Sequence, residues 1–306
     1  MSKNPISIGM PTYNNEATVE RAIQSVMNQT HQNWYLYISD DFSSDQTFER
    51  IDKLAATAPD RIKIVSPASR QYYMNFKHVL DFADTHYFAW LAGDDWWEPD
   101  FLARCLARLE NEPQAVACLA RCQFYEADGS TYIDPKARAM EESMSCRVAR
   151  YLLDPDQTRM YGLFHRQALV RSFPSELCHA YDWCLIAGTL RLGTHVDIDE
   201  HLMNRERTPS ARYIDVVDQD EPSPVLRFFP VLRMSWIGLR DGIIPITPRV
   251  IAALFYINIL KNRQQMQRRA NTLAKLSSPI YRVTLIITRR LAAQPVSRAR
   301  RKRFLP

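Results

Sequence analysis

The stretch YFAWLAGDDWW, residues 87–97, begins as a short apolar run and ends beyond the adjacent carboxylates Asp94 and Asp95. A second stretch, WYLYISDD at residues 34–41, has the same form. Each apolar run is typical of a buried β-strand. In an open α/β sheet, ligands bind beyond the carboxyl ends of the strands, so the two aspartate pairs are expected to meet in one crevice. Clustered carboxylates repel one another unless a cation or donor groups lie between them, which indicates a nucleotide site with a divalent metal.

Strands and helices alternate around these stretches. Residues 6–10 form a β-branched run that ends at Pro11, and apolar residues then recur at helical spacing from Val19 to Met27. The same pattern predicts further strands at 34–39, 61–65, 87–92, 116–124, 161–164 and 195–198, and helices at about 45–56, 75–84, 100–110, 182–192 and 249–269. This alternation predicts right-handed crossovers and a mostly parallel sheet, which becomes mixed in the second half.

Charge divides the chain into unequal parts. The 306 residues carry a net charge of +5, yet residues 242–306 contain fourteen Lys and Arg residues and no Asp or Glu. Such a segment indicates an anionic partner. The acidic, proline-containing segment 215–224 has the composition of an exposed connector. We therefore predict an α/β domain at residues 1–214, a connector at 215–224 and a helical, basic region at 225–306.

Cysteine usage and hydropathy predict a cytoplasmic location. The six cysteines form neither a C-x-x-C pair nor a regular framework, as expected for reduced thiols. The N-terminus lacks the basic and apolar regions of a signal peptide. The longest near-apolar run, residues 251–260, is about half as long as the ~20 residues that a helix needs to cross a bilayer. The protein is expected to touch a membrane without crossing it.

Three segments together resemble a known family. They are IGMPTYNN at residues 8–15, DDFSSD at 40–45 and GDDWW at 93–97. In this order and approximate spacing, the chain resembles the family 2 glycosyltransferases over about residues 5–213. The resemblance implies a GT-A fold, which is a Rossmann-like, mostly parallel mixed α/β sheet flanked by helices, here with a C-terminal helical basic appendage. It also implies inverting sugar transfer from a nucleotide donor.

The resemblance assigns a set of nucleotide-binding residues. They are Pro11, Thr12, Tyr13, Asp41, Asn75 and Asp94. An aromatic ring at a strand end can stack on a base, although Tyr13 could instead be a packing residue. Asp41 matches the acceptor of a hydrogen bond from the uracil imide, which suits an ionised carboxylate. The Arg that often precedes the matched Asn is Met74 here, and Arg70 could substitute for it.

The resemblance also implies a metal, Mn²⁺ or Mg²⁺, at a DxD-type site. Asp95 is the expected direct ligand, with Asp94 beside the nucleotide. The diphosphate leaving group accumulates negative charge, which a divalent ion bound by oxygen ligands offsets. This sequence departs from the commonest pattern, because Ala92 stands where the family has another Asp. An ordinary surface turn rich in Asp is the alternative interpretation.

An inverting transfer needs one general base for the acceptor hydroxyl. Asp182 matches the family position, although Tyr181 stands where an acid usually precedes it. The alternative is that Asp182 only caps a helix. Other candidate bases are His179, His165 and Glu176.

Two arginines are candidates for a diphosphate clamp. Residues 204–210 occupy the place of a family loop that closes over the donor, and Arg205 or Arg207 could bind phosphate oxygens with its planar fork. Arg207 stands where His is common in the family, which puts a metal-ligand role there in doubt. Both could be ordinary surface arginines.

The sequence thus predicts a glycosyltransferase that moves a sugar from a UDP-linked donor to a lipid-linked or polysaccharide acceptor in bacterial cell-surface glycan synthesis. A non-catalytic nucleotide-sugar-binding or scaffold protein is the alternative, which Ala92 and Tyr181 favour. The basic tail has three interpretations: a nucleic-acid arm, a solvated segment, or a contact with anionic lipid. Nothing else in the chain resembles a base-reading module, so no nucleic-acid partner is expected. The stripe of apolar residues from Ile280 to Leu291 favours lipid, at the inner face of the cytoplasmic membrane.

Overall fold

The computed structural model describes residues 4–134, 139–140, 142–156, 158–176, 178–207 and 231–269, and the single residues 223, 226 and 229. Strands and helices alternate through the first third of the chain, as the periodicity predicts. The elements are β1 (Ile6–Thr12), α1 (Val19–Met27), β2 (Trp34–Asp40), α2 (Thr47–Ala55), β3 (Ile62–Ile64), α3 (Met74–Phe82), β4 (Tyr87–Trp90), β5 (Trp96–Trp97) and α4 (Phe101–Glu110).

The second half also mixes strands and helices. Its elements are β6 (Ala115–Glu126), β7 (Thr131–Ile133), α5 (Met144–Leu153), the short 3₁₀ helix η1 (Arg159–Tyr161), β8 (Leu163–His165), α6 (Arg166–Ser172), α7 (Tyr181–Leu192), β9 (Thr194–Arg207), α10 (Leu232–Arg240) and α11 (Pro248–Arg269). The elements β5, β7, α5 and α6 have no counterpart in the sequence prediction, and α10 lies in region 225–306, which was predicted only to be helical. The strands β5 and β7 and helix α6 are too short for periodicity to reveal them, whereas α5 is as long as α4 and has an amphipathic pattern that the prediction missed.

The strands form one mixed sheet in the order β3-β2-β1-β4-β8-β6-β9-β5, with β7 paired to β6. Strands β3, β2, β1 and β4 are parallel. Strand β8 is antiparallel to both β4 and β6, whereas the long strands β6 and β9 are parallel to each other. The α/β fold with a mostly parallel, later mixed sheet is therefore confirmed.

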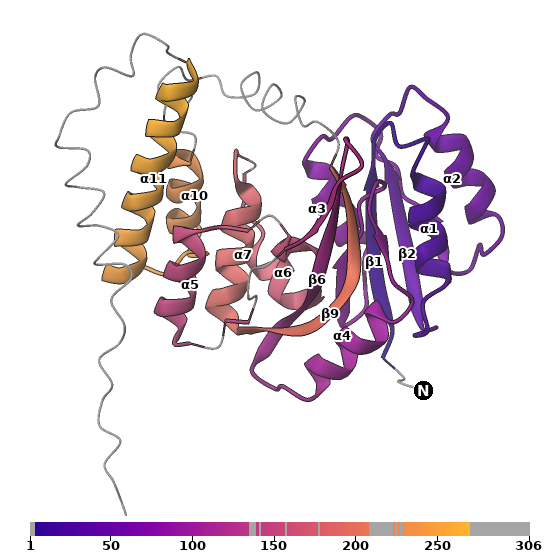
Figure 1. Cartoon of the computed structure of the whole chain (residues 1–306), viewed down its shortest axis with the longest axis horizontal. Coiled ribbons are helices and arrows are strands. Elements are labelled where there is room, and N and C mark those ends of the chain that lie inside the picture. Colours follow the sequence, from indigo (N-terminus) through magenta and orange to yellow (C-terminus); the bar gives the residue numbers. More distant parts are fainter. Residues whose placement is uncertain are drawn as a thin grey trace, which may run out of the picture.

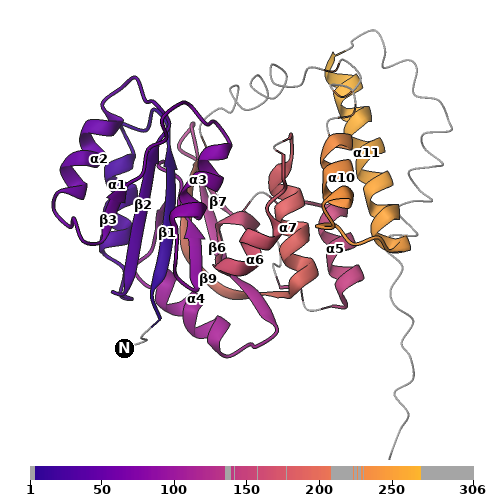
Figure 2. The ribbon, with the colours of Figure 1, turned by 180° about the vertical axis from the view of Figure 1, so that it is seen from behind.

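Side-chain alternation along the strands builds a separate core on each face of the sheet. In β4, Phe88 and Trp90 point to one face, and Tyr87 and Ala89 point to the other. One core packs against α1, α2 and α4, and the other packs against α3 and α7. Figures 1 and 2 show α1 and α2 at one end of the molecule.

Helices α5, α7, α10 and α11 form a layer at the other end (Figure 1). Helix α11 packs mainly on α5, and α10 packs on α7. Val231 and Ile257 belong to the same buried cluster as Leu152 and Cys184. The described part of region 225–306 therefore shares its core with the preceding domain. The predicted connector at 215–224 lies almost wholly outside the described residues. The division into domains stays a prediction. Among the described helices, none has the length and apolar character that crossing a bilayer requires.

Candidate active site

A cavity of about 500 Å³ opens at the carboxyl ends of β1, β2 and β4. It lies at the edge where the two aspartate pairs were expected to meet. Of the predicted site residues, those that line it are Pro11, Thr12, Tyr13, Asp41, Asn75, Asp94 and Arg205. Asp95 and Asp182 are not lining residues, and the side chain of Arg207 lies outside the described part of the chain.

Asp41 anchors the segment between β3 and α3 at one side of the cavity. Its side chain is buried, and its two carboxylate oxygens accept hydrogen bonds from the backbone N–H of Gln71, at 2.5 Å, and of Tyr72, at 2.8 Å. A carboxylate has about four acceptor sites, so Asp41 keeps the capacity to accept a donor from a ligand. The same residue can therefore hold the wall of the cavity and contact a base within it.

Arg70 lies beside Asp41, with its Nε 3.8 Å from an Asp41 oxygen. Its guanidinium lies 4.1 Å from the ring centre of Tyr13 and 4.6 Å from that of Tyr72. Cation–π contacts of this kind hold the arginine over the Tyr13 ring. Arg70 lines the cavity and Met74 does not, which agrees with the suggested substitution.

Asn75 lines the cavity and has an unused acceptor. The residue is 2% exposed, and its Nδ2 donates to the carbonyl of Ser39 at 2.9 Å. Its Oδ1 is buried without a hydrogen-bond partner. Buried polar atoms are rarely left unpaired, so this oxygen is suited to accept a hydrogen bond from a ligand.

Asp95, which is buried, forms an ion pair with Arg205 at the wall of the cavity. Arg205 Nε donates to Asp95 Oδ2 at 3.0 Å, and its guanidinium lies 4.2 Å from the ring centre of Tyr161. Asp95 is fully buried, and its Oδ1 has no hydrogen-bond partner. Burial raises the pKa of Asp95 to about 7, although Arg205 opposes the shift. Burial also raises the pKa of Asp94.

These groups fit a divalent cation. Within the described residues, no set of three or more His, Cys, Asp or Glu side chains is arranged to hold a metal ion. Mg²⁺ at nucleotide sites usually takes only one or two carboxylates and completes its shell with phosphates and water. The unpaired Oδ1 of Asp95 and the carboxylate of Asp94 at the cavity wall supply such a partial set.

Asp182 lies at the start of α7, close to the cavity but not on its wall. The ring of its neighbour Tyr181 is 5.8 Å from that of Tyr73, which lines the cavity. The Asp182 Oδ1 is shielded from solvent and has no hydrogen-bond partner. Burial raises the pKa of Asp182 to about 6, with a further contribution from Asp156, against the opposing effect of backbone N–H groups. A carboxylate with this pKa is ionised at neutral pH and can take a proton.

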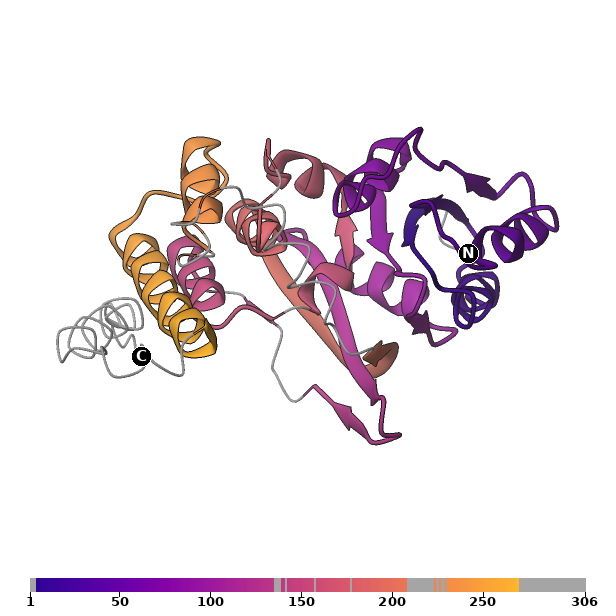
Figure 3. The same ribbon diagram turned by 90° about the horizontal axis from the view of Figure 1, so that it is seen from above.

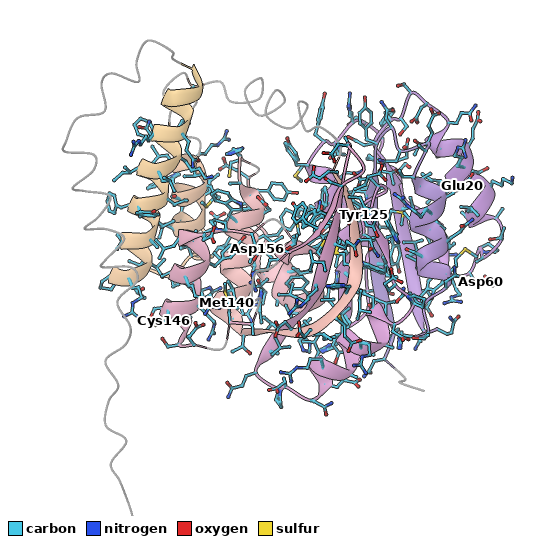
Figure 4. All side chains as sticks on the ribbon, viewed as in Figure 1. Glu20, Asp60, Tyr125, Met140, Cys146 and Asp156 are labelled. Atoms are coloured by element: carbon cyan, nitrogen blue, oxygen red, sulfur yellow. The ribbon has the colours of Figure 1, made fainter. Side chains whose placement is uncertain are left out.

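A buried polar network supports α7 from behind. Asp156 accepts hydrogen bonds from the backbone N–H and the Nε of Arg159, at 2.7 and 3.0 Å. Arg159 also lies 3.4 Å from His195 on β9, which in turn contacts Thr189 on α7 at 3.1 Å. Figure 4 shows Asp156 between the sheet and the helical layer. The network ties η1, β9 and α7 together, so it fixes the position of the helix that carries Asp182.

Two of the other candidate bases lie away from the cavity, and the third, His179, three residues before Asp182, is not among its lining residues. His165 pairs with Tyr87 in the sheet register, at the amino-terminal end of β4 and so at the edge opposite the cavity. Its ring nitrogen contacts His86 at 2.8 Å. Glu176 is exposed and accepts a hydrogen bond from Arg240 at 2.6 Å. Neither residue lines the cavity.

Several lining residues were not predicted. They are Asn15, Tyr72, Tyr73, Phe76 and Tyr161. Phe76 directly follows the predicted Asn75, and the first three lie two or three residues from Tyr13 or Asn75, so that proximity is a signal the sequence did contain. Tyr161 comes from η1, in a segment whose structure could not be assigned from periodicity. Arg205 lies within β9 rather than in a loop, because β9 extends to Arg207 and pairs with β6 along most of its length.

Comparison with known proteins gives the following matches. The family model described as "Glycosyl transferase family 2" matches residues 7–173, more than half of the chain. The chain is 34% identical over 93 residues to UDP-Glc:alpha-D-GlcNAc-diphosphoundecaprenol beta-1,3-glucosyltransferase WfgD of Escherichia coli, a match that covers 30% of this chain and 36% of WfgD. The chain spans about 40% of the length of the first curated relatives it matches.

Solved structures share the fold. The crystal structure of Staphylococcus aureus TarS residues 1–349 with UDP-GlcNAc gives a TM-score of 0.62 at 15% identity, over 93% of this chain and 79% of that one. The mannosyltransferase PcManGT of Pyrobaculum calidifontis, in complex with GDP-Man and Mn²⁺, gives a TM-score of 0.56 at 16% identity, over 95% and 86% of the two chains.

Proposed function

The chain belongs to glycosyl transferase family 2. On that premise we propose that it transfers a sugar from a UDP-sugar, with inversion, to a lipid-linked or polysaccharide acceptor. The proposed setting is bacterial cell-surface glycan synthesis. The observation that carries the proposal is the cavity. It gathers seven predicted site residues from three strand ends, a helix and β9 around a volume of about 500 Å³, which is in the range of ligand sites.

The lining of the cavity supports donor binding there, because its two sides differ in their chemistry. One side offers the Tyr13 ring, the Asp41 carboxylate and the unpaired oxygen of Asn75, which suit a planar base with N–H donors. The other side offers Asp94 and Arg205, which suit a metal-bound diphosphate. TarS was solved with UDP-GlcNAc, and the printed name of WfgD specifies UDP-Glc and a diphosphoundecaprenol-linked acceptor. These relatives support a uridine donor and a lipid-linked acceptor.

A divalent metal, Mn²⁺ or Mg²⁺, is part of the proposal. PcManGT was solved with Mn²⁺. Asp95 would hold the ion through its unpaired Oδ1, with Asp94 beside it. When bound, the ion stabilises negative charge on the departing diphosphate. Arg205 would add a second positive charge from the β9 side of the cavity.

Asp182 is proposed as the general base for the acceptor hydroxyl. Its buried position raises its pKa to about 6, close to the operating pH of a cytoplasmic enzyme and therefore suited to proton transfer. One base suffices for an inverting displacement, since no covalent intermediate has to form.

The anionic membrane surface is proposed as a partner of the basic C-terminal region. Residues 242–306 hold fourteen basic and no acidic residues. Polybasic segments bind anionic leaflets with about 1 kcal/mol per charge. A lipid-linked acceptor would place the enzyme's substrate in the same layer.

The test is a thermal-shift screen of UDP- and GDP-sugars with and without Mn²⁺. A ligand that binds the native state raises its melting temperature. We expect one UDP-sugar to stabilise the protein in the presence of Mn²⁺, and Asp41→Ala to remove that effect. Asp81→Asn, which loses only an exposed pair with Lys77, is the matched control.

Failure of every nucleotide sugar to raise the melting temperature would contradict the proposal. Binding without transfer or donor hydrolysis would instead support the alternative of a nucleotide-sugar-binding scaffold. In the proposed enzyme, both reactions should disappear in Asp95→Ala.

A further inference from the structure

Helices α10 and α11 carry apolar side chains where a surface helix normally carries charge. In the described part of the chain, the three large apolar residues with the highest exposed fractions are Ile246 at 78%, Trp236 at 64% and Phe255 at 61%. All three belong to α10, α11 or the turn that joins them. Isolated exposed apolar residues are common, but a group of this kind marks a contact surface.

The exposed stripe of α10 is largely apolar. Leu232, Trp236 and Arg240 follow one another at a spacing of four residues, so they lie along one side of the helix. In α11, Phe255 is the single exposed residue between Arg249 and Arg263. The side chains that face solvent at the middle of both helices are thus Trp and Phe.

These side chains lie on the same side of the helix pair. The helices run in opposite directions (Figures 1 and 3), and Asn258 Nδ2 of α11 donates to Ser235 Oγ of α10 at 2.9 Å. Trp236 is about 100° beyond Ser235 around its helix, and Phe255 is about 60° from Asn258 around its own. Because the helices are antiparallel, these two rotations bring the side chains of Trp236 and Phe255 to the same side of the helix pair. We call Leu232, Trp236 and Phe255 the apolar face.

The charges on α10 and α11 favour an anionic partner, because the charged side chains described on these two helices are all Arg or Lys. Two carboxylates that contact α10 are already paired: Glu176 Oε1 with Arg240 Nη1 at 2.6 Å, and Asp241 Oδ1 with Arg240 Nε at 2.8 Å. Beyond Asp241 the sequence contains only basic charges, fourteen of them up to residue 306. Trp and Phe beside Lys and Arg form the composition that binds the interface of an anionic bilayer.

We infer that the apolar face of α10 and α11 inserts into the headgroup region of an anionic lipid bilayer. This inference rests on the proposed membrane partner and assigns it a contact made by folded helices rather than by the basic tail alone. The contact would orient the whole molecule, because α11 packs on α5 and α10 packs on α7. Helix α7 carries Asp182, so docking through this layer would fix the catalytic base relative to the membrane plane.

The experiment is cosedimentation of the full chain with vesicles of phosphatidylglycerol and phosphatidylcholine, and with vesicles of phosphatidylcholine alone. The test variant is Trp236→Ser with Phe255→Ser. The matched control is Phe48→Ser with Phe82→Ser, two phenylalanines that are 45% and 48% exposed on α2 and α3. All four side chains are exposed, so both variants should fold, and their melting temperatures check this.

We expect the wild type and the control to bind anionic vesicles alike, and the test variant to bind at least roughly tenfold more weakly, since membrane affinity scales with buried apolar area. Equal binding by the test variant would overturn the inference and leave the proposed role of the basic tail intact. Absence of wild-type binding would overturn both. A concentration-dependent dimer that only the test variant loses would assign the face to a second copy of the chain and overturn the lipid contact.

Discussion

At the scale of single residues, the ion pair between Asp95 and Arg205 raises the question of what each side chain binds when the donor is present. Both side chains are needed for donor binding in the proposed function, yet here they bind each other at 3.0 Å in a buried place. Burying one charge without a partner is strongly unfavourable, which explains why they pair. In the proposed donor complex Arg205 would turn from Asp95 Oδ2 to the diphosphate, which would leave both oxygens of Asp95 for the metal.

This exchange predicts opposite effects of Arg205→Gln on two ligands. Removing the internal cation should strengthen the binding of Mn²⁺ alone, because the metal no longer competes with Arg205 for Asp95. Binding of UDP with Mn²⁺ should weaken by roughly ten- to hundredfold, since a hydrogen bond between charged groups contributes about 1.5–3 kcal/mol. Calorimetric titration of Mn²⁺ and of UDP measures both.

Arg104→Gln is the control for that experiment, because Arg104 pairs with Glu200 on the exposed surface. If Arg205→Gln weakened both ligands equally, the two side chains would not exchange partners. A variant that bound both as the wild type does would remove Arg205 from the donor site.

Asp182 gives a prediction about pH. Transfer requires the ionised carboxylate, and burial raises its pKa to about 6, so the transfer rate should fall as the pH is lowered through about 6. Asp182→Asn should lower the rate by about 10²–10⁴-fold, the usual contribution of a general base, while nucleotide binding is unchanged. The rate of transfer between pH 5 and 8, and UDP affinity by calorimetry, are the measurements.

Glu176→Gln serves as the comparison, since this exposed alternative base lies outside the cavity lining. Its rate and pH profile should match those of the wild type. If Asp182→Asn transferred sugar at the wild-type rate, the base would be another residue. The same would follow if its transfer rate still fell at the same acidic pH as that of the wild type.

At the scale of elements, the close approach of α3 to the sheet positions the cavity. Gly9 in β1 lies under α3, and a Cβ at this position would stand 2.6 Å from both Val79 Cγ2 and Phe88 Cζ. Glycine therefore lets α3 pack tightly, and the start of that helix carries Asn75. Alternate residues of β1, Ile8 and Met10, fill the core on the opposite face.

Gly9→Ala should destabilise the fold by about 1–3 kcal/mol, because an added methyl group overpacks the contact between β1 and α3. Urea unfolding followed by circular dichroism measures the change. Gly129→Ala, at a turn with open space around it, adds no contact and should cost about 1 kcal/mol or less through its positive φ. Equal stability of Gly9→Ala and wild type would show that α3 can shift away without cost.

At the scale of the whole molecule, the most exposed apolar side chains gather at one end. The helical layer carries the apolar face and leads directly into the most basic part of the sequence. The opposite end, formed by α1 and α2, lies beside strands that hold the nucleotide residues (Figure 2). A molecule docked through the helical layer keeps the donor side accessible from solution.

The basic tail gives a prediction at this scale. Neutralising Arg300, Arg301 and Arg303 to Gln together removes three charges, which should weaken binding to phosphatidylglycerol vesicles by roughly hundredfold at about 1 kcal/mol per charge. Donor binding should be unaffected. Raising the salt concentration should weaken the wild type more than the variant. Unchanged vesicle binding in the triple variant would leave the tail as a solvated segment.

The sequence by itself determined the alternation of strands and helices, the two aspartate pairs at strand ends and the family. These features are local: a strand or an amphipathic helix shows its period within ten to twenty residues, and parallel strands bring their carboxyl ends to one edge. The fold class and the meeting of Asp41 and Asp94 at one cavity could therefore be expected from spacing, and the place of Asn75 beside them from the family resemblance. The positions of α5, α6 and α10 in the fold could not, because they depend on contacts with α7 and α11 that leave no local pattern.

Only the tertiary structure decided which side chains lie close together. Tyr161 and Arg205 reach the cavity from segments far along the chain, and the pairing of Arg205 with Asp95 joins residues 110 positions apart. The raised pKa of Asp182 and the exposure of Trp236 have the same origin, since burial is a property of packing. Sequence pattern specifies each element and its amphipathic character, but the partner of a buried charge and the face left without a partner depend on how the elements meet.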